Sequence, residues 1–197
     1  MSMNYILASQ SPRRREILEN LGVDFRVVVA ETDESSDLRD PCCLVEILAR
    51  RKGEAVWHAL KQAGEDLSDT VIIASDTVVA TEDEILGKPR DAEDATRMLR
   101  MLEGKRHRVI SGVFLMGQGK SATAHEVTQV EFDPLSEEEI AAYISATNPY
   151  DKAGAYAIQG KASAFIKGIH GCYFNVVGLP VHCLNALHRR LFGKNLI

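Results

Sequence analysis

The sequence predicts an α/β fold with a mixed β-sheet. Segments with strand patterns and helix patterns alternate along most of the chain, which is typical of α/β proteins. Two strand-like segments, 107–116 and 124–132, follow one another around a glycine-rich turn, which indicates an antiparallel pair in the same sheet. Because no repeat, low-complexity tract or clear linker interrupts the chain, we expect a single domain over residues 1–197.

The first three elements are predicted from short local signals. Residues 5–8 are a strand candidate. A helix follows in which Ser11 is the N-cap, Pro12 is the first residue and Gly22 marks the end. The β-branched run 25–30 predicts a second strand.

An acidic loop, 31–40, leads into a long predicted helix, 41–62. The apolar stripe of this helix includes Arg51, with Lys52 at its margin. The apolar members of the stripe are Leu44, Ile47, Leu48, Ala55 and Ala59. The nearly continuous apolar run 71–80 then predicts a strand that is buried on both faces.

The later helices have clear start signals. Asp91 caps a predicted helix that Gly104 ends, and Ser136 with Glu139 forms a capping box that begins another helix. The chain closes with a predicted strand over 162–169 and an amphipathic helix over 179–192.

Composition and charge exclude several classes of protein. Apolar residues make up 45% and charged residues 26%, as in ordinary soluble globular proteins. No apolar run reaches the ~18 residues of a membrane span, and the N-terminal stretch lacks the basic region of a signal peptide. The net charge of -5 argues against a nucleic-acid polymer as partner. The four cysteines form neither a C-x-x-C pair nor a zinc pattern, which predicts a reducing, cytoplasmic location.

The segment Gly119-Lys120-Ser121 resembles part of a phosphate-binding P-loop. That motif needs a glycine at position 114, where this chain has Phe114, and the residues after the segment have a strand pattern rather than a helix pattern. We therefore expect an ordinary hairpin turn here.

The start of the first helix is a candidate anion site. Free N–H groups of a first helical turn attract anions, and Arg13 and Arg14 add positive charge beside the N-cap Ser11. Arginines at this end oppose the helix dipole, and a bound anion would relieve that penalty. The alternative is a solvated surface group, and local sequence does not decide between the two.

Asp76 is a carboxylate within a buried apolar strand, which is costly unless it is paired or binds a metal. The alternative is a structural aspartate bonded to nearby backbone. The loop residues Glu31, Asp33 and Glu34 form an acidic cluster that could join Asp76 around a hard divalent cation, or could simply be solvated.

Three further candidates lie later in the chain: Lys88 in a short turn, and Lys152 and Gln159 among small residues. Each has an alternative as ordinary loop polarity. Cations from separate segments together with an acidic metal site suit a polyphosphate, whose charge must be neutralised before water can attack. The amide of Gln159 suits the hydrogen-bonding edge of a nucleobase.

The chain resembles the Maf family of nucleoside triphosphate pyrophosphatases over nearly its whole length. The motifs that carry the resemblance keep their order along the chain: SQSPRR, the TDES loop, ARRK, ASDTVV, LGKPRDAEDA, DKAGAYAIQG and NVVGLP. The resemblance implies a Maf/Ham1-like fold, an elongated mixed β-sheet flanked by helices with two lobes around a central cleft. It also implies hydrolysis of a nucleoside triphosphate to the monophosphate and pyrophosphate, a divalent cation such as Mg²⁺, and a homodimer.

The resemblance also assigns roles to individual residues. Asp76 becomes the proton acceptor, with Glu34 as its partner in holding the metal. Arg13, Thr77 and Gln159 match positions associated with base specificity. Arg14, Lys52, Lys88 and Lys152 match polar positions that line the cleft.

The motifs Asp76-Thr77-Val78 and Ile158-Gln159-Gly160 resemble the subgroup that hydrolyses dTTP and UTP. A relative specific for 7-methyl-GTP is the first alternative. The second is a nucleotide-binding regulator of septum formation. The joint presence of Asp76, Lys52 and Lys88 favours turnover over binding alone.

Overall fold

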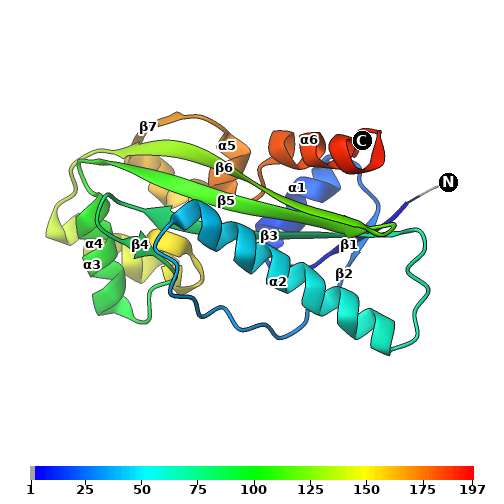
Figure 1. Ribbon diagram of the computed structural model, residues 1–197. Helices are drawn as coiled ribbons and strands as arrows, with labels where there is room; N and C mark the ends of the chain where they lie inside the picture. The colour runs from blue at the N-terminus through cyan, green and yellow to red at the C-terminus, as the bar shows by residue number, and fades with distance from the viewer. Residues whose placement is uncertain (1–2) are drawn as a thin grey trace. The chain divides into compact units, whose positions relative to one another are not determined.

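The computed structural model describes residues 3–197 and confirms the α/β class (Figure 1). The strands are β1 Asn4–Leu7, β2 Phe25–Val27, β3 Thr70–Ala80, β4 Ile85–Leu86, β5 Arg106–Gly117, β6 Lys120–Phe132 and β7 Ile166–His170. The α-helices are α1 Pro12–Asn20, α2 Pro41–Gln62, α3 Ala92–Leu102, α4 Glu137–Thr147, α5 Tyr173–Val177 and α6 Val181–Phe192. Short 3-10 helices are η1 Pro149–Asp151, η2 Ala153–Ala155 and η3 Lys161–Ala164.

The described strands form a seven-stranded sheet in the order β2-β1-β3-β5-β6-β7, with β4 paired to β3. Strand β1 is parallel to both β2 and β3. Strand β4 is antiparallel to β3, and β7 is antiparallel to β6, so the sheet is mixed as predicted. In the turn between β5 and β6, Gln118 and Gly119 both have positive φ angles, 51° and 72°. This geometry is that of a tight hairpin, which confirms the turn and rules out a P-loop at this place.

The chain divides into two compact units, each described here by itself. The first contains the chain up to Asp76, Ser111–Glu126 and Gly178–Ile197, and the second contains Thr77–Ile110 and Val127–Val177. The single domain over residues 1–197, whose residues 1 and 2 lie outside the described part, stays a prediction. Within residues 3–197, every helix is too short or too polar to cross a bilayer.

In the first unit, helix α2 lies unusually close to the sheet because two glycines face the contact. A Cβ atom at Gly53 would come within 2.3 Å of the Phe114 ring on β5. A Cβ atom at Gly112 would come within 2.4 Å of the Val45 carbonyl oxygen on α2. Only glycine permits this approach. The short distance between α2 and the sheet then fixes how far the side chains beside Gly53 reach across the sheet.

The core of the second unit contains a cluster of aromatic rings. His107 is 3% exposed and makes edge contacts with Phe132 and Tyr156, at centroid distances of 4.8 and 5.4 Å. Its Nε2 atom is hydrogen bonded to the Tyr156 hydroxyl at 2.7 Å. Burial lowers the pKa of His107 to about 4 and raises the pKa of the Tyr156 hydroxyl. The imidazole is therefore neutral near pH 7.

The predicted apolar stripe of α2 is confirmed at Leu48 but is otherwise displaced by about one position from the buried face. Ile47 is exposed and Ala59 lies on the outer face, whereas Lys52 falls between buried positions one turn away on either side. The buried residues of α2 are Pro41, Val45, Leu48, Ala49, Gly53, Val56 and Leu60. The helix turns the larger Val56 and Leu60 side chains into the core in place of Ala55 and Ala59, because they remove more apolar surface from water.

Two predicted strands differ in length from those observed. The strand predicted over 25–30 ends at Val27. The segment predicted as a strand over 162–169 begins instead with η3, where Ser163 N donates to Gly160 O and Phe165 N donates to Ala162 O. Small residues have weak strand preference, so local turns form there before β7 begins at Ile166. The last helix, α6, begins at Val181 rather than at 179.

Candidate active site

The side chain of Lys52 lies against two carboxylates in the first unit. Its Nζ atom is 2.8 Å from Glu34 Oε1 and forms an ion pair with Asp76 Oδ1. The Lys52 and Asp76 side chains are 19% and 11% exposed, whereas Glu34 is 53% exposed. A largely buried ion pair is costly to desolvate. This cluster is therefore a candidate functional site rather than an ordinary exposed ion pair.

The position of Lys52 follows from the packing of α2. Because Gly53 brings the helix against Phe114, the adjacent Lys52 is close enough for its side chain to reach β3. Asp76 is the last residue of the first unit and lies in the buried part of β3. The structure thus brings together residues 24 positions apart in sequence.

The acidic loop is fastened to α2 by the neighbouring arginine. Arg51 Nη1 donates to the carbonyl oxygens of Asp33 and Ser35, at 3.1 and 2.8 Å. The Asp33 carboxylate also accepts a bond from Ser35 N at 2.8 Å, and the Ser35 bonds lower the pKa of Asp33. These contacts hold the backbone on both sides of Glu34, which places its carboxylate beside Lys52.

The start of α1 is capped as predicted. The Ser11 side chain accepts from Arg14 N at 3.5 Å, and Pro12 is the first helical residue. Arg13, which lies between Pro12 and Arg14, is half-buried. The first turn contains no acidic residue, so its positive end is not neutralised from within the helix.

Arg14 points into the first unit rather than into solvent. Its Nε atom donates to Gly178 O at 2.8 Å, and its Nη1 atom donates to Ser75 O at 2.8 Å and to Ser9 Oγ at 3.1 Å. Burial lowers the pKa of the Arg14 guanidinium, and the negative charge of Asp76 opposes that shift. Arg14 therefore belongs to the surroundings of Asp76.

The other predicted residues lie in the second unit. Lys88 is exposed, and Lys152 is half-buried and paired with Asp151. The segments that carry the two lysines are joined by a hydrogen bond from Gly154 N to Gly87 O at 3.0 Å. Two cations from distant parts of the chain are thereby held on adjoining segments.

Thr77 and Gln159 also lie in the second unit. Thr77 follows Asp76 directly in β3 and is half-buried. Gln159 is exposed and precedes Gly160, whose φ of 86° is one that only glycine adopts readily. The amide of Gln159 is thus presented from a turn rather than from a helix or strand.

The carboxylates of Glu34 and Asp76 fit a magnesium ion that arrives with phosphate ligands. Across residues 3–197, no group of three or more His, Cys, Asp or Glu side chains is placed to hold a metal by itself. Mg²⁺ commonly uses only one or two carboxylates and takes its other ligands from substrate phosphates and water. Glu34 and Asp76 already meet around one positive charge, that of Lys52, which is the donor chemistry such an ion needs.

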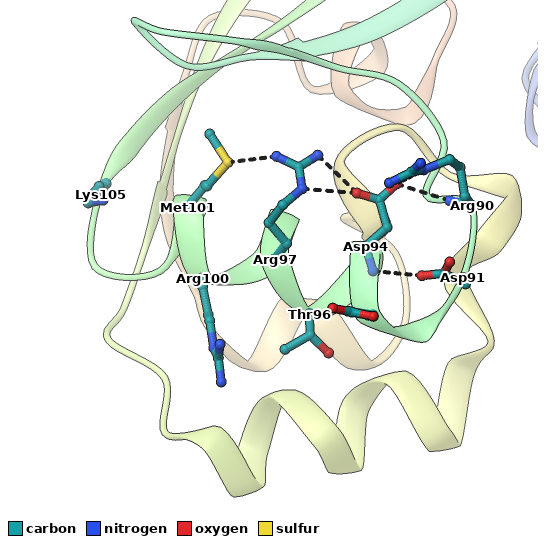
Figure 2. Close-up of a pocket in the computed structure, with 9 residues that line it drawn as sticks. Arg90, Asp91, Asp94, Thr96, Arg97, Arg100, Met101 and Lys105 are labelled. Atoms are coloured by element: carbon teal, nitrogen blue, oxygen red, sulfur yellow. Dashed lines mark hydrogen bonds and ion pairs between the residues drawn. The ribbon is translucent and has the colours of Figure 1, made fainter.

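Figure 2 shows a pocket in the second unit that lies along α3. None of the predicted site residues lines it. Its polar side chains bond to one another: Arg97 donates to Asp94 at 3.0 Å, and the Asp94 carboxylate also accepts from Arg90 N at 3.1 Å. These groups are engaged with one another along α3 rather than directed into the pocket, so no ligand is assigned to it.

The interpretation of the sequence missed the residues that support the cluster. Ser9 and Ser75 supply oxygen acceptors for Arg14, and Gly178 supplies another. Gly53 was a signal for the packing of α2 that the sequence did offer, because an isolated glycine in a helical pattern often marks a close approach.

A family model and individual relatives place the sequence in the same family. Residues 4–191 match the family model described as Maf-like protein. The chain is 47% identical over 195 residues to the dTTP/UTP pyrophosphatase of Pelotomaculum thermopropionicum, which covers 98% of each chain. It is 48% identical over 181 residues to the dTTP/UTP pyrophosphatase of Carboxydothermus hydrogenoformans, which covers 91% of this chain and 94% of the relative. Since the family model spans almost the whole sequence and these relatives match it nearly end to end, the chain belongs to the Maf-like protein family.

Proposed function

We propose that this protein is a hydrolase that converts dTTP and UTP to the nucleoside monophosphate and pyrophosphate. The observation that carries the proposal is the 47% identity, over 98% of both chains, to a protein named dTTP/UTP pyrophosphatase. The cluster of Glu34, Lys52 and Asp76 supports it, because hydrolysis of a triphosphate needs a base and positive charge in one place.

In this proposal, Asp76 accepts the proton of the attacking water. The water oxygen bonds to the α-phosphorus, the bond from that phosphorus to the oxygen bridging the α and β phosphates breaks, and pyrophosphate leaves with that oxygen. Lys52 holds the Asp76 carboxylate in place, and its positive charge stabilises negative charge that develops on phosphate oxygens. Ser11 and Arg13, at the positive end of α1, bind substrate phosphate or base.

The residues of the second unit keep the roles that the resemblance implies. Lys88 and Lys152 neutralise phosphate oxygens, and Thr77 and Gln159 contact the base. When bound, a divalent cation, proposed to be Mg²⁺ and held by Glu34 and Asp76, would neutralise phosphate charge and polarise the phosphorus centre. We further propose that the protein is a cytoplasmic homodimer and that a nucleic-acid polymer is not its substrate.

A panel of nucleoside triphosphates tests this function directly. The purified protein is incubated with dTTP, UTP, CTP and 7-methyl-GTP, with and without Mg²⁺, and the products are separated by chromatography. We expect monophosphate and pyrophosphate from dTTP and UTP, only with the metal. Nucleoside diphosphate with orthophosphate would contradict the reaction, and preference for 7-methyl-GTP would contradict the substrate. Nucleotide binding without turnover would support a regulator instead.

The substitution Gln159→Glu tests the base assignment. A glutamine amide can match the O4 and N3–H edge of uracil or thymine, whereas a carboxylate lacks the donor that O4 needs. We expect kcat/KM for UTP and dTTP to fall by about tenfold or more and the preference to shift toward the cationic base of 7-methyl-GTP. If the wild-type protein hydrolyses CTP as well as UTP, or the preference ratios do not move, Gln159 does not contact the base.

A further inference from the structure

Arg14 donates to three oxygens of the first unit, two backbone carbonyls and the hydroxyl of a buried serine. Two of its bonds, from Nε to Gly178 O and from Nη1 to Ser75 O, are 2.8 Å long. The third, from Nη1 to Ser9 Oγ, is 3.1 Å long, and Ser9 is 8% exposed. Charged hydrogen bonds to buried carbonyls are stronger than neutral ones, and the planar guanidinium fixes the directions of all three.

One of these carbonyls belongs to the peptide group that joins Ser75 to Asp76. Its oxygen accepts from Arg14, so the guanidinium fixes the orientation of the peptide plane from which the Asp76 side chain departs. A peptide plane is rigid, so its orientation, together with the φ angle of Asp76, sets the direction of the Asp76 Cα–Cβ bond.

A second contact ties the same strand to the segment before α6. The Ser75 hydroxyl donates to Gly178 O at 3.2 Å, and Gly178 O is also the acceptor of Arg14 Nε. Ser75 is fully buried. Arg14, Ser75 and Gly178 therefore form a closed set of hydrogen bonds, with one member immediately before Asp76.

We infer that Arg14 is a positioning residue that holds the Asp76 backbone, rather than a residue that lines the cleft to bind substrate. Three of its N–H donors are directed at protein oxygens of the first unit, and a phosphate contact through those donors would break these bonds. This inference rests on the proposed function, in which Asp76 accepts the proton. Precise placement of such a base matters because misplacement by about 1 Å can cost 10²-fold in rate.

The experiment compares Arg14→Lys and Arg14→Gln with the control Arg15→Gln. Arg15 is exposed, and its Nε atom pairs with Glu19 at 2.7 Å, so its loss removes one charge from the same helix without touching Ser75. A lysine keeps the charge of Arg14 but lacks the fork that reaches three acceptors. We expect kcat for dTTP to fall about tenfold or more in both Arg14 variants, with KM within about twofold of wild type. The control should match wild type.

A milder variant and a second measurement cover the case in which Arg14 variants fold poorly. Ser9→Ala removes one acceptor of Arg14, which Ser11 N also uses at 3.2 Å, and should lower kcat by about threefold. Hydrogen exchange, followed by mass spectrometry, should become faster in peptides that contain Ser75 or Gly178 in the Arg14 variants, and not in the control.

The outcomes separate this inference from the proposed function. A raised KM with unchanged kcat, or unchanged exchange around Ser75 and Gly178, would overturn positioning and return Arg14 to the substrate. A wild-type protein that releases no pyrophosphate from any triphosphate would overturn the proposed function. In that case the exchange measurement alone still decides whether Arg14 holds this backbone.

Discussion

Lys52 in the first unit and Arg97 in the second each lie between two carboxylates, but in different surroundings. Lys52 is 19% exposed and pairs with Asp76, which is 11% exposed, and with Glu34 from a distant loop. Arg97 is 43% exposed and pairs with Glu84 at 2.8 Å. It also pairs with Asp94, three positions before it on the same helix, at 2.9 Å (Figure 2).

The comparison shows that burial of the cation, rather than the number of ion pairs, distinguishes the two regions, because the Asp94 carboxylate is itself only 5% exposed. Exposed pairs such as Arg97 with Glu84 typically contribute about 0.2–1 kcal/mol and are screened by salt. The pair of Lys52 with Asp76 loses most of its contact with water, so removal of one partner should cost more than removal of a partner from an exposed pair. The ion pairs of Arg97 lie beside the pocket along α3, yet the buried pair of Lys52 with Asp76 is the better candidate for catalysis.

The largest expected effect is on turnover. Asp76→Asn keeps the shape of the side chain and removes the proton acceptor, so kcat should fall by about 10²-fold or more. The matched control is Asp91→Asn, since Asp91 caps α3 and asparagine caps equally well. Pyrophosphate release gives the rates, and circular dichroism shows whether both variants fold. Full turnover in a folded Asp76→Asn protein would remove Asp76 from the mechanism.

The next effect is on stability. Gly53→Ala places a methyl group where the Phe114 ring lies, 2.3 Å away, so we expect the free energy of unfolding to fall by about 3 kcal/mol. Gly168→Ala is the control, because nothing lies within 4 Å of its Cβ position and its φ is not positive. Urea denaturation measures both variants. Equal stability of the two would show that α2 does not need this close approach.

A double-mutant cycle compares the two ion pairs themselves. We expect a coupling free energy of about 2 kcal/mol between Lys52→Met and Asp76→Asn, because the pair is largely buried. For Arg97→Gln and Glu84→Gln the coupling should be below about 1 kcal/mol. Both cycles use the free energy of unfolding at two salt concentrations. Similar couplings, or similar salt sensitivity, would contradict the distinction drawn above.

The smallest effect concerns pH and lies in the aromatic core of the second unit. Burial depresses the pKa of His107 from 6.5 to about 4, so protonation favours the unfolded chain. The stability that His107 contributes is complete above pH 6.5 and is lost as the pH falls toward 4. Between pH 7 and 5.5 the loss should be about 1 kcal/mol, and His107→Leu should abolish that part of the pH dependence.

The control for this prediction is His58→Gln, which replaces an exposed histidine of the first unit. Thermal unfolding of the three proteins over this pH range measures the effect. If His107→Leu keeps the full pH dependence of the wild-type protein, the imidazole is not the group that titrates.

Secondary structure with strong end signals could be predicted closely from the sequence. The limits of α2 were predicted at Pro41 and Gln62, and α4 begins at its capping box. These signals are local, because a cap or a proline acts within one turn of its own position. The buried strand around Asp76 could also be predicted, since a continuous apolar run needs no knowledge of its neighbours.

What only the tertiary structure decided depends on contacts between distant residues. The sequence by itself marked Asp76, Lys52 and Glu34 as candidates, but the face of α2 that carries Lys52 was set by the packing of Gly53 on Phe114. The sequence likewise marked Arg14 as a cation, whereas its bonds to Ser75 and Gly178 join residues 61 and 164 positions away. Periodicity cannot specify such pairs, because it describes only which side of an element is apolar, whereas close packing selects the atoms that meet.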